Sequence, residues 1–264
     1  MHGNGGSNIA RIPPVLRTLA VAAVLLAGPA VPSAYAVSFS VSPTQIVLAG
    51  RTRSALLTIR NESTDVLRFQ LSAFAWQQSP AGEVQLNATE DIVFFPALFT
   101  LQPGEERRIR VGTPVTAVAQ REQSYRIFVE ELPPVSVATE KPAGVRVLTR
   151  MGIPIFLRPA KETASATLDG LAMRDGKVAF TLSNTGAVHF IPRRVTARGA
   201  DASGKTIFEQ PVSGWYVLAG GRREFAVDAP EGACERVALL TIEAELPFAT
   251  LTERLERAPG VCRP

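Results

Sequence analysis

Histidine and cysteine are scarce in this sequence, and their scarcity excludes most catalytic chemistry. The 264 residues contain two histidines and two cysteines, and His189 is the only histidine beyond the N-terminal segment. A serine–histidine–acid triad would need His189 at its centre, yet the sequence has no Gly-x-Ser-x-Gly motif. Two distant cysteines and one histidine do not complete the coordination sphere of a metal. We therefore expect a protein that is not an enzyme and that holds no metal or cofactor.

A long apolar run and a strong charge imbalance are also absent. The apolar run Leu19–Ala27 is shorter than the roughly 20 residues that span a bilayer, which argues against a stable membrane anchor. Arg11 and Arg17 precede it and Ala34-Tyr35-Ala36 offers a cleavage site, so residues 1–36 are predicted to be a secretory signal peptide. The remaining 26 basic and 24 acidic residues provide no basic surface, and we expect no binding to nucleic acid.

The two cysteines, Cys234 and Cys262, both lie in the second half of a chain that is predicted to be exported. An oxidising compartment and an even number of cysteines favour a disulfide between them over free thiols. Closing a loop of this length stabilises a fold by about 3–4 kcal/mol in the chain-entropy description. We therefore predict a Cys234–Cys262 disulfide.

Helix-length periodicity is absent, and short strands separated by turn residues take its place. Leu67, Phe69 and Leu71 alternate with polar residues, as in a strand with one buried face. Turns are predicted at Pro80-Ala81-Gly82 and Pro103-Gly104. Strand-like runs continue through residues 177–190, 211–227 and 236–246. The sequence predicts an all-β fold of antiparallel, immunoglobulin-like sandwiches. The 228 residues beyond position 36 suit two domains.

The segment Val145–Pro159 is the clearest candidate for function. Its alternate residues form a nearly continuous apolar row, which comprises Val145, Val147, Thr149, Met151 and Ile153. A period of two residues predicts an extended strand with two distinct faces. Such a row normally packs in the protein's own core, and the pattern alone leaves that interpretation open. A second predicted strand, Tyr125–Pro134, precedes a connection rich in proline and glycine, so the two strands should be neighbours.

The segments YRIFVEELPP and IFLRP, the latter at Ile155–Pro159, resemble the PapD-like periplasmic chaperones of the chaperone–usher pilus pathway. Leu101–Val111 and Arg60–Ser63 extend the resemblance within the first half, and Asn184–His189 extends it more weakly into the second. The resemblance implies two immunoglobulin-like domains in a bent arrangement. We place the first at residues 37–159 and the second at residues 160–264.

In that family the last strand of the first domain is lent to a pilus subunit that lacks a strand of its own. The resemblance therefore implies a chaperone that binds pilus or fimbrial subunits by donor-strand complementation and delivers them to an outer-membrane usher. The implied donor residues are Val145, Val147, Thr149 and Met151. An exposed apolar edge would also allow self-association of the free chaperone.

One departure from the family concerns charge. The family binds the subunit's C-terminal carboxylate with an arginine and a lysine, and Gln45 and Pro154 occupy these positions here. This departure indicates a divergent branch, such as the archaic chaperones that serve spore-coat-U-like subunits. Arg126 and Arg150 are our candidates for the carboxylate anchor, because a guanidinium binds a carboxylate bidentately. A role as ordinary solvated side chains stays open for both.

The resemblance also implies a buried ion pair between the domains. By the match of EELPP and FLRP, Glu131 and Arg158 occupy its positions, and Glu243 is the candidate for a third member from the second domain. Two unrelated surface charges are the alternative.

A secreted structural or adhesive sandwich protein, such as a surface-fibre subunit, is the alternative function. A subunit should carry a free donor extension at its mature N-terminus. Only a short SVSPTQ segment precedes the first strand here, which favours the chaperone.

Overall fold

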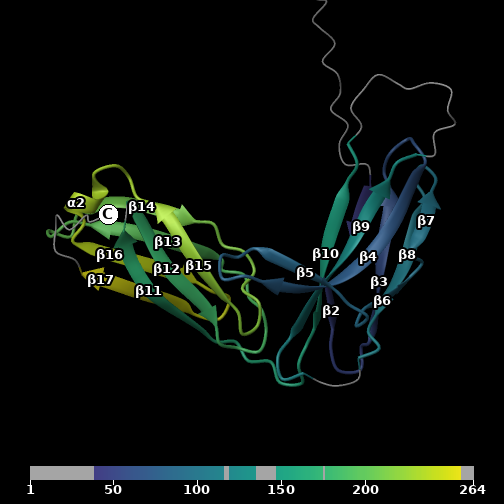
Figure 1. Cartoon of the computed structure of the whole chain (residues 1–264), viewed down its shortest axis with the longest axis horizontal. Coiled ribbons are helices and arrows are strands. Elements are labelled where there is room, and N and C mark those ends of the chain that lie inside the picture. The colour runs from purple at the N-terminus through teal and green to yellow at the C-terminus, as the bar shows by residue number, and fades with distance from the viewer. Residues whose placement is uncertain (1–38, 116–118, 135–146, 175, 257–264) are drawn as a thin grey trace, which may run out of the picture. The chain divides into compact units, whose positions relative to one another are not determined.

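The computed structural model describes residues 39–115, 119–134, 147–174 and 176–256 (Figure 1). These residues form strands and one four-residue helix, so the predicted all-β fold is confirmed. Within these ranges, no helix is long and apolar enough to cross a membrane. The predicted signal peptide, Val145 and Cys262 lie outside the described residues. The predicted boundary at Pro159 stays a prediction, because the described residues belong to one compact unit.

The first ten strands form a sandwich of two sheets. One sheet has the order β1-β3-β8-β6, and the other has the order β2-β10-β9-β4-β5 with β7 also paired to β4. The strands are β1 Phe39–Ser42, β2 Ile46–Leu48, β3 Ser54–Asn61, β4 Leu67–Gln78, β5 Val84–Ala88, β6 Val93–Phe95, β7 Leu98–Leu101, β8 Glu106–Gly112, β9 Gln123–Leu132 and β10 Arg150–Leu157.

The core of the first sandwich follows the alternation of its strands. Leu67, Phe69 and Leu71 of β4 are all buried, which confirms the two-faced strand that the sequence predicts. The ring of Phe69 meets that of Phe39 edge-on, with 4.9 Å between centroids. Each such side chain, fully buried, stabilises the fold by about 1.5–3 kcal/mol. The apolar rows of both sheets therefore supply the core between them.

The remaining strands form a second sandwich with its own core. Its sheets have the orders β11-β12-β15 and β14-β13-β16-β17. The elements are β11 Ala166–Arg174, β12 Lys177–Asn184, β13 Arg194–Ala200, β14 Thr206–Val212, β15 Arg222–Asp228, α2 Ala233–Arg236, β16 Leu239–Glu245 and β17 Thr250–Glu256. Phe180 and Phe225 stack in this core at 4.9 Å.

Strand β10 lies between β9 and β2, and its two edges are unequally paired. It pairs with β9 antiparallel along its whole length, from Arg150 to Leu157. It pairs with β2 in parallel only at its last three residues, Ile155–Leu157. Among the described residues, the edge of Arg150–Pro154 that faces away from β9 therefore has no strand partner.

The strand predicted over Val145–Pro159 is shorter in the structure, because β10 begins at Arg150. Its ladder with β9 extends one step further, since the Glu131 N–H donates to the Thr149 carbonyl at 3.0 Å. Strand β9 ends at Leu132 and is followed directly by Pro133 and Pro134. Proline has no N–H to donate, so the ladder cannot continue past this point.

Candidate functional site

The apolar row of β10 runs from the core to the surface. Ile155 and Ile153 are fully buried, Met151 and Thr149 are partly buried, and Val147 is 80% exposed. Alternate residues of an extended chain share a face, so one face is core at one end and open at the other. Met151 also packs against the first core, so this predicted donor residue belongs partly to the protein's own interior.

Arg126 lies in the same cross-strand row as the two positions where the family carries its cations. Pro154 of β10 is directly opposite Arg126 of β9. Ile46 is opposite Ile155, which places Gln45 beside Pro154 on the other side of β10. Opposite residues of an antiparallel pair have Cα atoms about 4.5–5.5 Å apart. The positive charge of Arg126 therefore lies on the strand next to Pro154, one of the two positions where the family has a cation.

Aromatic side chains from both sandwiches hold the Arg126 guanidinium. Its central carbon lies 4.0 Å from the ring centroid of Trp76 and 4.9 Å from that of Trp215. Burial lowers the pKa of Arg126, although an arginine stays protonated at neutral pH. Arg126 Nε and Trp76 Nε1 are buried donors without a hydrogen-bond partner in the described part of the chain. Buried donors normally have an acceptor, so Arg126 and Trp76 offer hydrogen bonds that no described residue accepts.

Arg150, the second predicted anchor, is already partnered. Its Nε lies 3.4 Å from Glu130 Oε2, and its guanidinium stacks 4.0 Å from the Phe128 centroid. Glu130 is four residues beyond Arg126 on β9, which is roughly 13 Å at about 3.3 Å per residue. Arg126, by contrast, forms no ion pair with a described carboxylate. The structure thus distinguishes two candidates that the sequence left equal.

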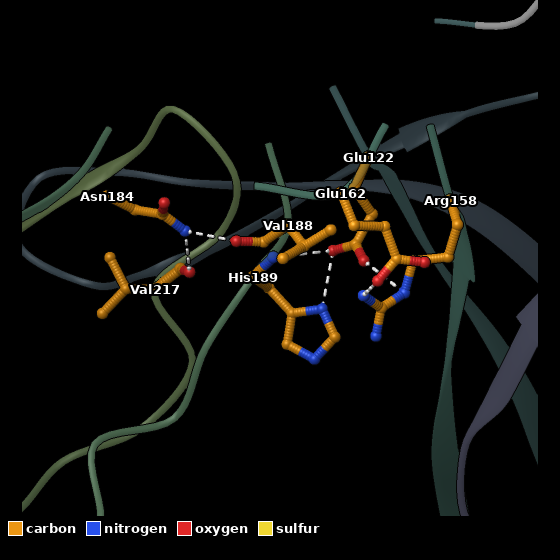
Figure 2. A network of polar contacts seen from close by, with 7 residues as sticks. All are labelled: Glu122, Arg158, Glu162, Asn184, Val188, His189 and Val217. Carbon is orange, nitrogen blue, oxygen red and sulfur yellow. Dashed lines mark hydrogen bonds and ion pairs between the residues drawn. The ribbon is translucent and has the colours of Figure 1, made fainter. Parts of the chain in front are cut away.

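Figure 2 shows a buried ion pair at the other end of β10. Arg158 Nε lies 3.1 Å from Glu122 Oε2, and Arg158 Nη1 lies 2.8 Å from Glu162 Oε2. The Glu122 side chain is fully buried, whereas Glu162 is exposed. Glu122 Oε1 also accepts the backbone N–H of His189 at 3.1 Å and lies 2.6 Å from His189 Nδ1. Glu122 therefore joins the first sandwich to a loop of the second.

The predicted pairing of Arg158 with Glu131 is wrong. The register of β9 and β10 places Glu131 beside Thr149, at the opposite end of β10 from Arg158. The acid that meets Arg158 is Glu122, which precedes β9, whereas Glu131 is near the strand's end. Glu243 lies within β16 and is not an ion-pair partner of Arg158.

His189 packs against residues of the first sandwich. Its ring stacks on Phe156 of β10, with 3.7 Å between centroids and 17° between planes. Asn184 fixes the preceding turn, because its Nδ2 donates to the carbonyls of Val188 at 2.8 Å and Val217 at 3.0 Å (Figure 2). The turn therefore brings His189 to both Phe156 and Glu122.

Sequence reasoning missed Glu122 and the aromatic residues around Arg126. Trp76 and Trp215 are the only tryptophans of the chain, which was the available signal. Nothing local in the sequence connects them, since they are on different sandwiches. The signal for Glu122 was its place immediately before the strand that pairs with β10.

A family model supplies an independent comparison. Residues 38–162 match the model for the pili and flagellar-assembly chaperone, PapD N-terminal domain. These residues form a PapD-like chaperone domain. The match supports a chaperone role in pilus assembly, and it covers the whole of β10 and Arg158. No curated protein matches this chain.

Solved structures of pilus chaperones resemble this chain in fold. A chain of the CsuC–CsuE chaperone–tip adhesion subunit pre-assembly complex of Acinetobacter baumannii is 18% identical, with a TM-score of 0.56 over 83% of this chain and 98% of that one. A chain of the SafA pilin–SafB chaperone complex of Salmonella enterica is 14% identical, with a TM-score of 0.55 over 84% and 99%. The E. coli chaperone DraB is 18% identical, with a TM-score of 0.51 over 84% and 96%. These TM-scores show a common fold.

The contacts in Figure 2 predict that removing Arg158 destabilises the fold much more than removing Glu162, its exposed partner. Arg158→Ala should lower the free energy of unfolding by about 3–5 kcal/mol, because buried Glu122 would lose its cation. Glu162→Ala removes an exposed partner and should cost about 0–1 kcal/mol. Urea unfolding followed by tryptophan fluorescence measures both. Equal, small losses for the two variants would show that the buried pair does not stabilise the fold.

Proposed function

We propose that this chain is a periplasmic, non-enzymatic chaperone that holds pilus or fimbrial subunits along the open edge of β10 and delivers them to an outer-membrane usher. One observation carries the proposal. The apolar row of β10 leaves the protein's own core where the Arg150–Pro154 edge has no described strand partner. A subunit that lacks a strand can pair with this edge and receive the exposed side chains.

Backbone and side chains have separate tasks in this proposal. The N–H and C=O groups of the edge supply a ladder that any extended chain can complete, which gives affinity. The alternate side chains give specificity, with Val147, Thr149 and Met151 as donors and Val145 continuing the row beyond the described residues. Val147, if fully buried by the subunit, would contribute about 1.5–3 kcal/mol.

The end of β10 determines where the subunit strand must stop. The open edge closes at Ile155, where β2 begins to pair. A subunit strand that fills the edge must end there or cross the face of β10 at Pro154. Crossing brings its terminus to Arg126, which has no carboxylate partner among the described residues and whose Nε is a buried donor beside Trp76 Nε1. The subunit strand would then run parallel to β10, with its carboxylate on the guanidinium.

Arg150 is the weaker anchor, because Glu130 competes for its charge. A carboxylate at Arg150 would first have to displace that ion pair.

The remaining parts of the proposal rest on the sequence. We infer export by a cleaved signal peptide at residues 1–36 and domains at residues 37–159 and 160–264. The disulfide between Cys234 and Cys262 belongs to the same proposal, since an exported chain folds under oxidising conditions. Spore-coat-U-like subunits are the proposed clients of a divergent chaperone of this type. Before a client arrives, the open edge also permits self-association.

A charge at the donor row tests the edge. Val147→Asp should weaken binding of a fluorescent peptide of alternating valine and threonine at least tenfold and leave thermal stability unchanged, because a buried carboxylate is costly. Val93→Asp is the matched control, since Val93 is 53% exposed on the other sheet of the same sandwich. If Val147→Asp unfolds the protein, the row belongs to the protein's own core. If both variants bind like the unmodified chain, the donor face lies elsewhere.

The carboxylate anchor is tested with the same peptide in free-acid and C-terminally amidated forms. Arg126→Ala should weaken binding of the free acid about tenfold or more, because hydrogen bonds to charged groups contribute about 1.5–3 kcal/mol. Binding of the amide should change little. Arg110→Ala is the control, since Arg110 lies on β8 and donates to Ser54 Oγ at 3.1 Å. A similar loss for acid and amide would exclude Arg126 as the anchor.

A further inference from the structure

We propose that Trp215 contacts the last side chain of the client and makes the chaperone prefer clients that end in an aromatic residue. This inference rests on the proposed capture of a carboxylate at Arg126. It assigns to the second sandwich a direct part in choosing the client.

Trp215 is an exposed aromatic side chain at the proposed anchor. It lies between β14 and β15 and keeps 36% of its surface exposed, although its ring is only 4.9 Å from the Arg126 guanidinium carbon. The centroid of its ring also lies 5.9 Å from the ring centroid of Trp76 and 5.5 Å from that of Tyr216. These rings occupy part of its surface and leave the rest open to solvent.

The chain around Trp215 is held in place by contacts with both sandwiches. The next residue, Tyr216, accepts a hydrogen bond from Gln78 Nε2 on β4 at 2.9 Å through its carbonyl. Val217 exchanges backbone hydrogen bonds with Phe190 at 2.9 and 3.2 Å. The Tyr216 ring packs edge-on against Trp76 at 5.2 Å. The exposed ring of Trp215 is therefore preorganised, which reduces the entropy lost when a ligand binds.

Covalent geometry places the last side chain of a bound client near this ring. A carboxylate that accepts hydrogen bonds from Arg126 has its oxygens about 2.7–2.9 Å from the guanidinium nitrogens. The terminal Cα is one bond from that carboxylate, so its side chain starts within reach of Trp215. An aromatic side chain can stack on the indole or meet it edge-on. A basic one would instead be repelled by Arg126.

The test uses three labelled peptides of alternating valine and threonine that differ only at the C-terminus: phenylalanine acid, glycine acid and phenylalanine amide. The unmodified chain should bind the phenylalanine acid about three- to tenfold more tightly than the glycine acid, as expected for one aromatic pair. Trp215→Ala should abolish this preference, and Trp215→Phe should retain most of it. Phe248→Ala is the matched control, because Phe248 is an exposed aromatic residue of the same sandwich and is 38% exposed.

The outcomes separate this inference from the proposed function. Persistence of the phenylalanine preference in a folded Trp215→Ala variant would overturn the role of Trp215 and leave the anchor standing. Equal binding of phenylalanine acid and glycine acid by the unmodified chain would do the same. Equal binding of phenylalanine acid and amide would overturn the anchor at Arg126. If Trp215→Ala does not fold, Trp215→Leu takes its place, and persistence of the phenylalanine preference in that variant overturns the role of Trp215.

Discussion

The pairing register of β10 is the constraint on which the rest of the structure depends. It places Ile153 and Ile155 in the core, Pro154 opposite Arg126, and Arg158 beside Glu122. A shift of one residue would turn every side chain of β10 to the other face and take Ile153 and Ile155 out of the first core. Because core burial opposes that shift, the same packing that stabilises the first sandwich also fixes which residues the open edge presents.

The second sandwich completes the site from the other side. Its loops bring His189 to Glu122, and Tyr216 and Trp215 to Trp76 and Arg126. Phe156 connects these two groups, since its ring contacts both His189 and Tyr216. The end of β10 is thus held by a buried ion pair and by stacked rings, while the strand's beginning stays uncovered by the described residues. Under the proposed function, this contrast makes β10 a rigid support at one end and a binding edge at the other.

Local patterns predicted the strands well, and long-range contacts were the part that they could not supply. The alternation of Leu67, Phe69 and Leu71 was sufficient for β4, and the apolar row was sufficient for the faces of β10. The two prolines after β9 were visible in the sequence, and their missing N–H groups explain why β10 is shorter than expected. Local patterns tell less about charge partners.

The acid beside Arg158 shows this limit. Glu122 and Glu131 flank the same strand, and only the register of β9 with β10 decides which of them meets Arg158. The contact of Glu122 with His189 joins residues 67 positions apart. The gathering of Trp76, Arg126 and Trp215 likewise depends on how two sandwiches meet, and no periodicity within a strand encodes it.

Residue-resolved amide hydrogen exchange with and without the valine–threonine peptide is the most direct measurement of the edge itself. Binding at β10 should slow exchange at alternate amides of Arg150–Ile153, because only those N–H groups point away from β9. Strand β5 is the edge strand on the opposite side of the same sheet, and exchange of its amides should not change. Slower exchange in Val84–Ala88 with no change in Arg150–Ile153 would contradict donation by β10.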